Sequence, residues 1–190
     1  MSIQLKEISK SFDDILLYHK LNAEIRENRV TCIMGPSGSG KTTLTYLLMG
    51  LVKQDYGRID GLDGKRITAV FQEDRLCENI DAVKNVLLVC DRKTVRSQVE
   101  QEFREVGLTD YNGKPAAELS GGMKRRVAIV RALLPDSDIV IMDEPFKGLD
   151  EELKLRVINY VKSRIEGKTV ILITHDKEEA EALSADYLYL

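Results

Sequence analysis

The 190-residue chain lacks the features that would place it within a membrane or outside the cell. No apolar run approaches the roughly 18 residues that a membrane-spanning helix needs. The longest runs, near 139–142 and 170–173, have the length of strands. Residues 1–6 do not show the basic and then apolar pattern of a signal peptide. If the protein serves a membrane, we therefore expect it to dock onto other subunits.

The chain also lacks an excess of positive charge and an organised set of cysteines. Its formal net charge is −3, which predicts no general attraction to nucleic acid or to an anionic bilayer. Cys32, Cys77 and Cys90 are odd in number and lack metal-ligand spacing, as is typical of thiols in a reducing cytosol. With 43% hydrophobic and 31% charged residues, the composition indicates one ordinary globular domain over residues 1–190.

Hydrophobic patterning indicates an α/β fold. Alternating residues at 3–8 and 21–26 predict an N-terminal antiparallel β-subdomain, and the segment 73–119 is rich in charges and helix formers. Elsewhere short apolar strands alternate with helices, which favours a mostly parallel sheet flanked by helices. We therefore expect a nucleotide-binding core from 1–72 and 120–190 with a helical lobe inserted at 73–119. The expected core strands are 30–34, 138–142, 168–173 and 187–190, and the expected core helices are 42–50, 122–134, 151–165 and 177–183.

A glycine-rich segment between a predicted strand and a predicted helix indicates a phosphate-binding loop. It satisfies the pattern G-x-x-x-x-G-K-[ST]. Glycines let the backbone aim successive N–H groups at a phosphate, and the helix start adds its positive end. We expect Lys41 to reach the β- and γ-phosphates and the hydroxyl of Thr42 to ligate Mg²⁺. The nucleotide-contacting residues predicted here are Gly35, Ser37, Gly38, Ser39, Gly40, Lys41, Thr42 and Thr43.

Two carboxylates follow the apolar strand predicted at 138–142. Ligands of open α/β sheets gather at the carboxyl ends of the strands, so Asp143 and Glu144 are expected to face the phosphates. We predict that Asp143 holds Mg²⁺ and that Glu144 acts as the general base for an attacking water. The pattern up to this point predicts a P-loop nucleotide enzyme.

A third segment, Leu119-Ser120-Gly121-Gly122-Met123, precedes a predicted helix. On its own such a segment is typical of a helix N-cap. It also exposes a second set of N–H groups at a helix start, and so offers a second surface for a phosphate. Two such surfaces in one chain suggest a composite site.

With this segment, the sequence resembles the ATP-binding subunits of ABC transporters over nearly its whole length. Residues 119–123 are similar to the family's signature LSGGQ, and Met123 in place of glutamine resembles the importer branch that handles nitrate, sulfonate or taurine-like solutes. Residues 143–150 resemble the end of Walker B running into the D-loop. Residues 70–72 resemble the Q-loop, and residues 173–176 resemble the histidine switch.

The resemblance implies a role for each matching residue. Phe12 would stack on adenine, with a core phenylalanine as the alternative and Tyr18 as a rival for the adenine. Gln72 would coordinate Mg²⁺ or the attacking water, and His175 would hydrogen-bond the γ-phosphate. Asp150 would lie at a subunit interface. Contacts from a second subunit to the nucleotide are implied for Ser120, Gly121 and Gly122.

The resemblance also implies Mg²⁺-dependent ATP hydrolysis, coupled through a second ABC ATPase subunit to transmembrane permease subunits on the cytoplasmic face of the cell membrane. Two alternatives remain open. One is a soluble ABC-type ATPase acting in a non-transport process, although overall acidity argues against nucleic acid as a partner. The other is a P-loop kinase of small metabolites, which would lack the signature segment. The segment 60–70 is shorter than is usual for the family, and no C-terminal regulatory extension is expected.

Overall fold

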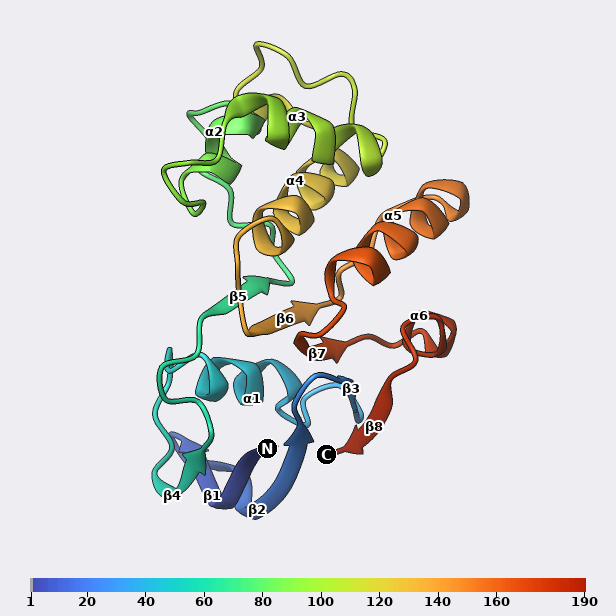
Figure 1. Ribbon diagram of the computed structural model, residues 1–190. Coiled ribbons are helices and arrows are strands. Elements are labelled where there is room, and N and C mark those ends of the chain that lie inside the picture. The colour runs from blue at the N-terminus through green and yellow to red at the C-terminus, as the bar shows by residue number, and fades with distance from the viewer. Residues whose placement is uncertain (1) are drawn as a thin grey trace.

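The computed structural model describes residues 2–190 and contains two β-sheets (Figure 1). The first is antiparallel, in the order β2-β1-β4, and consists of β1 (Ser2–Phe12), β2 (Ile15–Arg26) and β4 (Tyr56–Asp60). The second is parallel, in the order β5-β6-β7-β3-β8. Its strands are β3 (Val30–Met34), β5 (Ile67–Val70), β6 (Ile139–Asp143), β7 (Thr169–Ile173) and β8 (Asp186–Tyr189).

Helices lie on both sides of the parallel sheet (Figure 1). They are α1 (Lys41–Leu48), α2 (Ala82–Leu87), α3 (Arg96–Glu105), α4 (Gly121–Leu133), α5 (Glu151–Arg164) and α6 (Lys177–Ala182), with a 3-10 turn at Ala116–Glu118. The predicted α/β fold with an antiparallel N-terminal sheet is therefore confirmed. The first two strands are longer than expected and form one hairpin, and β4 was not predicted. None of the helices within residues 2–190 combines the length and the apolar character needed to cross a bilayer.

Alternate residues of the central strands point to opposite faces of the sheet and build two separate cores. Odd-numbered isoleucines such as Ile141 and Ile171 pack with α1 and the antiparallel sheet, whereas Val140 and Leu172 pack toward the other helices. Burying a side chain of this size stabilises the fold by about 1.5–3 kcal/mol. Because both faces are covered at β6 and β7, these strands are buried along their whole length and almost entirely apolar, which explains why they stand out in the sequence.

The helical lobe is built from α2 and α3, and both pack against α4 (Figure 1). Ser120 begins α4 as its N-cap, accepting a hydrogen bond from the backbone N–H of Met123 at 3.3 Å. The same helix also packs against β5 of the parallel sheet. Helix α4 is therefore in contact with the lobe and with the core.

A buried carboxylate connects the lobe to α5. Glu102 of α3 accepts a hydrogen bond from the hydroxyl of Tyr160 at 2.7 Å and pairs with Arg164 at 2.5 Å. A buried charge needs such partners, because removing one of them leaves part of its desolvation cost uncompensated.

We predict that Tyr160→Phe lowers the free energy of unfolding by about 1.5–3 kcal/mol, since Glu102 loses one of its two partners. Urea denaturation followed by circular dichroism measures this change. Tyr189→Phe is the matched control, because Tyr189 is exposed on the edge strand β8. Equal stability of the two variants would show that the Tyr160 hydroxyl contributes nothing to the connection.

Candidate nucleotide site

The parallel register brings four chain segments to one edge of the sheet. Ile173 of β7 lies opposite both Ile33 of β3 and Asp143 of β6, and Val70 of β5 lies opposite Met142. The residues that follow these strand ends therefore meet at one place, as expected for a ligand site in an open α/β sheet. They include the glycine-rich loop, Gln72, Glu144 and His175.

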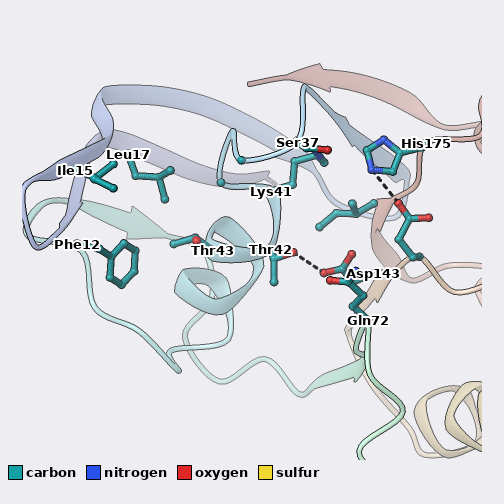
Figure 2. Close-up of a pocket in the computed structure, with 14 residues that line it drawn as sticks. Phe12, Ile15, Leu17, Ser37, Lys41, Thr42, Thr43, Gln72, Asp143 and His175 are labelled. Atoms are coloured by element: carbon teal, nitrogen blue, oxygen red, sulfur yellow. Dashed lines mark hydrogen bonds and ion pairs between the residues drawn. The ribbon is translucent and has the colours of Figure 1, made fainter.

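A cleft of about 440 Å³ opens at this edge (Figure 2). Phe12 of the β1–β2 hairpin lies on one side, 45% exposed, and Lys41 and His175 lie on the other. Many residues singled out from the sequence line the cleft together: Phe12, Ser37, Gly38, Gly40, Lys41, Thr42, Thr43, Gln72, Asp143, Glu144 and His175. Ile15 and Leu17, which the sequence analysis missed, extend its apolar side.

The glycine-rich loop is shaped to receive an anion. The φ angle of Gly40 is +96°, and α1 begins after it without a side-chain cap, so the first N–H groups of the helix are not bonded by a capping side chain. The ammonium group of Lys41 donates to the carbonyls of Gly35 at 2.8 Å and Pro36 at 2.9 Å. The hydroxyl of Ser39 is buried and has no hydrogen-bond partner within residues 2–190. These groups fit a phosphate that the loop would surround.

Tyr18 contacts the glycine-rich loop but does not line the cleft. Its side chain is buried, and its hydroxyl donates to the carbonyl of Gly40 at 2.5 Å. A Cβ atom at Gly40 would collide with the same hydroxyl, so the contact requires glycine as well as the left-handed backbone. Burial raises the pKa of Tyr18, which keeps the phenol protonated as a donor. Of these two aromatic residues, Phe12 is therefore the one whose ring is accessible for stacking on an adenine ring.

Thr42 and Asp143 form a direct contact from two separate elements. The Thr42 hydroxyl donates to the carboxylate of Asp143 at 2.8 Å, and Gln72 lines the same part of the cleft (Figure 2). Burial raises the pKa of Asp143, and its contact with Thr42 only partly opposes this shift. Proteins usually hold Mg²⁺ through one or two carboxylates together with substrate phosphates. The oxygen ligands at this place fit that pattern.

Glu144 is held in a strained conformation beside His175. Its φ is +49°, and its backbone N–H donates to the carbonyl of Ile173 at 2.8 Å. Nε2 of His175 lies 3.3 Å from Oε1 of Glu144, and this buried oxygen has no hydrogen-bond partner within residues 2–190. Burial raises the pKa of Glu144. Strained residues with unsatisfied polar atoms persist at functional sites, where a ligand can meet them.

The remaining predicted site residues do not line the cleft. Gly35 and Ser39 belong to the loop itself. Ser120 and Gly121 are exposed at the start of α4, with Gly122 beside them. Asp150 caps α5 by accepting a hydrogen bond from the N–H of Leu153 at 2.9 Å. The signature segment of one chain therefore lies outside the cleft formed by that chain.

The sequence analysis also missed Arg125, which contacts the Q-loop segment. It lies in a run of basic residues on α4 that resembles a solvated helix face, yet it is only 5% exposed. Its guanidinium group donates to the backbone carbonyls of Phe71 and Gln72. Because Arg125 lies between two other basic residues, Lys124 and Arg126, the sequence offers no signal that sets it apart from a solvated side chain.

The fold and the cleft define a P-loop nucleotide-binding domain with a signature segment, and comparison with known proteins identifies its family. Residues 18–147 match the family model described as ABC transporter. The chain belongs to this family, as the resemblance predicted.

Among its relatives, the chain is 34% identical to the aliphatic sulfonates import ATP-binding protein SsuB of Delftia acidovorans, over 100% of this chain and 79% of that protein. This relative bears out the resemblance to the importer branch. The chain is also 32% identical to the spermidine/putrescine import ATP-binding protein PotA of Acetivibrio thermocellus, over 96% of this chain and 56% of that protein. It thus spans about half the length of the PotA relatives.

Solved structures agree on the fold. The dimeric structure of MJ0796, a bacterial ABC transporter cassette, superposes with a TM-score of 0.86 at 29% identity, covering 98% of this chain and 94% of that one. A post-hydrolysis state of the same cassette, bound to ADP and Pi, gives a TM-score of 0.85 at 28% identity, covering 99% and 94%. The predicted ABC ATPase fold is confirmed.

The buried carboxylate of Asp143 is expected to cost stability when no cation is bound. Because burial raises its pKa in the folded protein, its contribution to stability is present at low pH and is lost as the pH rises through the folded-state pKa. We predict that Asp143→Asn, whose amide oxygen can still accept from Thr42, raises the Tm of the ligand-free protein at pH 7 by a few degrees, at about 2–4 °C per kcal/mol.

Differential scanning calorimetry at pH 7 and pH 4 measures the effect, and the two proteins should converge at the lower pH. Exposed Asp186→Asn is the control and should leave the Tm unchanged. A lower Tm for Asp143→Asn at pH 7 would contradict the account of Asp143 as a destabilising carboxylate.

Proposed function

We propose that the protein is the ATP-binding and ATP-hydrolysing subunit of an ABC transporter, with Mg²⁺ as its metal. One observation carries the proposal: the loop with Lys41, the Thr42–Asp143 pair and the Glu144–His175 pair all face one cleft. The relatives named as import ATP-binding proteins support a role in transport, and the neighbour bound to ADP and Pi supports hydrolysis.

The residues of the cleft divide the chemistry of phosphoryl transfer among them. Lys41 exchanges its bonds to loop carbonyls for phosphate oxygens, and Thr42 with Asp143 would hold Mg²⁺, which neutralises phosphate charge when bound. Glu144 takes a proton from the attacking water. Its raised pKa makes the carboxylate a stronger base than an exposed glutamate, and His175 beside it is placed to bond the γ-phosphate.

A second copy of the fold would complete the site. Ser120 and Gly121 are exposed at the start of α4, whose N-terminal N–H groups form a surface for an anion. Because this surface lies outside the cleft of its own chain, two chains in a head-to-tail pair would each cover the other's nucleotide. Both neighbouring structures are dimeric, which supports this arrangement. Hydrolysis of the shared γ-phosphate would then let the pair open.

We predict that Glu144→Gln keeps ATP affinity, lowers kcat by about 10²–10⁴-fold through loss of the general base, and accumulates as an ATP-bound dimer. Phosphate release measures hydrolysis, and light scattering coupled to size exclusion measures the dimer.

Lys41→Ala should instead weaken ATP binding itself, because the ammonium group of Lys41 is one of the proposed phosphate ligands.

Glu166→Gln, an exposed change in the turn after α5, is the matched control and should hydrolyse ATP at the parent rate. Parent-rate hydrolysis by Glu144→Gln would remove Glu144 from the role of base. A Glu144→Gln protein that stays monomeric with saturating Mg-ATP would contradict the head-to-tail pair.

We propose that a transmembrane partner docks in a second groove, of about 610 Å³. Such docking would hold this protein against the inner face of the membrane. Its apolar lining includes Met49, Leu51 and Phe71, and it has Val89 of the helical lobe along one side. Cationic side chains line it as well: Arg66, Arg75 and Arg131. This lining fits a short helix with an apolar face and a carboxylate, supplied by a permease subunit. Because Phe71 precedes Gln72, the occupant would contact the Q-loop directly.

We predict that Val89→Asp, a charge on the apolar wall of this groove, abolishes co-purification with transmembrane permease subunits from the source cells, while ATP hydrolysis by the isolated protein stays at the parent rate. Val95→Asp is the control, since Val95 is similarly exposed on the lobe but does not line the groove. Retention of the partner by Val89→Asp would place its docking surface elsewhere, and absence of any membrane partner would favour a soluble ATPase.

A further inference from the structure

Residues 71–75, which include the end of the Q-loop and the residues after it, are in contact with side chains of two helices, α1 and α4. On one side, Arg75 lies over the ring of Phe71, with its guanidinium carbon 4.2 Å from the ring centroid, and donates to the hydroxyl of Tyr46 on α1 at 2.8 Å. On the other side, Arg125 and Arg131 reach the segment from α4. The segment therefore bridges the helix that begins at the phosphate loop and the helix that begins at the signature.

Arg125 makes the contacts nearest to Gln72. Its Nη1 donates to the carbonyl of Phe71 at 2.7 Å, its Nη2 to the carbonyl of Gln72 at 2.5 Å, and its Nε lies 3.2 Å from the carboxylate of Asp74. The planar guanidinium group offers these donors in a fixed fork, which a lysine ammonium cannot reproduce. Two of the three acceptors are backbone oxygens, so the contact fixes the path of the main chain itself.

The position of Arg125 on α4 connects these contacts to the signature. Ser120 is the N-cap of α4, and Arg125 lies little more than one turn further along the same 13-residue helix. A helix of this length moves as a rigid element, so a displacement of Ser120 and Gly122 also displaces the guanidinium group. The backbone of Gln72, which lines the nucleotide cleft, is bonded to that group.

We propose that Arg125 is a positioning residue that sets the place of Gln72 in the cleft and makes it depend on the position of the signature segment. When the nucleotide of a second copy binds Ser120 and Gly122 of the first copy, it would move α4 of the first copy. Arg125 would then shift the position of Gln72 in the first copy's own cleft. This inference rests on the proposed function and adds to it a route by which each site senses the other's occupant. Arg131 adds a second connection between α4 and this segment, because it donates to the carbonyls of Asp74 and Arg75, two and three residues after Gln72.

Arg125→Lys tests the proposal in the full-length protein. We expect kcat for Mg-ATP hydrolysis to fall at least about tenfold, because small misplacements of a group in the cleft cost up to about 10²-fold. The KM for ATP should stay within about twofold, since Lys41 and the loop are untouched. Arg164→Lys is the control: Arg164 of α5 pairs with the buried carboxylate of Glu102 on α3, so this change should lower the Tm without changing kcat.

A double-mutant cycle shows whether Arg125 acts through Gln72. If it does, Arg125→Lys combined with Gln72→Ala should have the kcat of Gln72→Ala alone. If Arg125 only stabilises the fold, the two losses should multiply. Should Arg125→Lys fail to fold, Arg125→Gln, which keeps two amide donors, replaces it in the same cycle.

An unchanged kcat in Arg125→Lys, or losses that multiply in the double variant, would overturn the proposal while leaving the proposed function intact. A parent protein that binds Mg-ATP without hydrolysing it would contradict the proposed function, and this inference with it. The two failures are therefore told apart by the parent protein alone.

Discussion

The nucleotide cleft depends on the parallel pairing of β5, β6, β7 and β3. In this register the ends of the four strands lie side by side, with Asp143 opposite Ile173 and Ile173 opposite Ile33. A shift by one residue would turn every side chain to the other face of the sheet, moving the isoleucines out of their core. The same packing that stabilises the sheet therefore fixes which residues emerge at its edge. Lys41, Asp143 and Glu144 are placed by the hydrophobic effect before any ligand arrives.

The cleft itself works against the stability that the sheet provides. Asp143 is a buried carboxylate with a raised pKa, and Glu144 combines a raised pKa with a left-handed backbone and an oxygen that no hydrogen bond satisfies within residues 2–190. Strain of this kind costs on the order of 1–3 kcal/mol per residue and persists only where the surrounding structure enforces it. A cation beside Asp143 and a water molecule bonded to Glu144 would compensate the buried charge and the unsatisfied oxygen, so this part of the cost in the ligand-free protein favours the bound state.

The sequence was sufficient to predict the fold class and most of the cleft, for a physical reason. The glycine-rich loop and the strand ending in Asp143 and Glu144 are local patterns, and each local pattern dictates its own geometry. The contacts that were missed join residues far apart in the chain. Arg125 and Gln72 are separated by 53 positions, and nothing near Arg125 distinguishes it from a solvated basic residue. Strand β4 was missed because its pairing with β1 lies across a similar distance.

The position of the signature segment at the start of α4 explains why this helix contacts both the nucleotide cleft and the second groove. In the proposed head-to-tail pair, the signature segment would contact the nucleotide of the second molecule, so each chain would carry half of each of two sites. Such a design needs a connection between the two halves, because a nucleotide bound at one must affect the other. Helix α4 provides it: the helix starts at Ser120, bonds the backbone of Gln72 through Arg125, and lines the groove at Arg131. In the proposed pair, this one helix would thus contact the second chain at its start, the nucleotide cleft through Arg125, and the groove proposed for a permease subunit through Arg131.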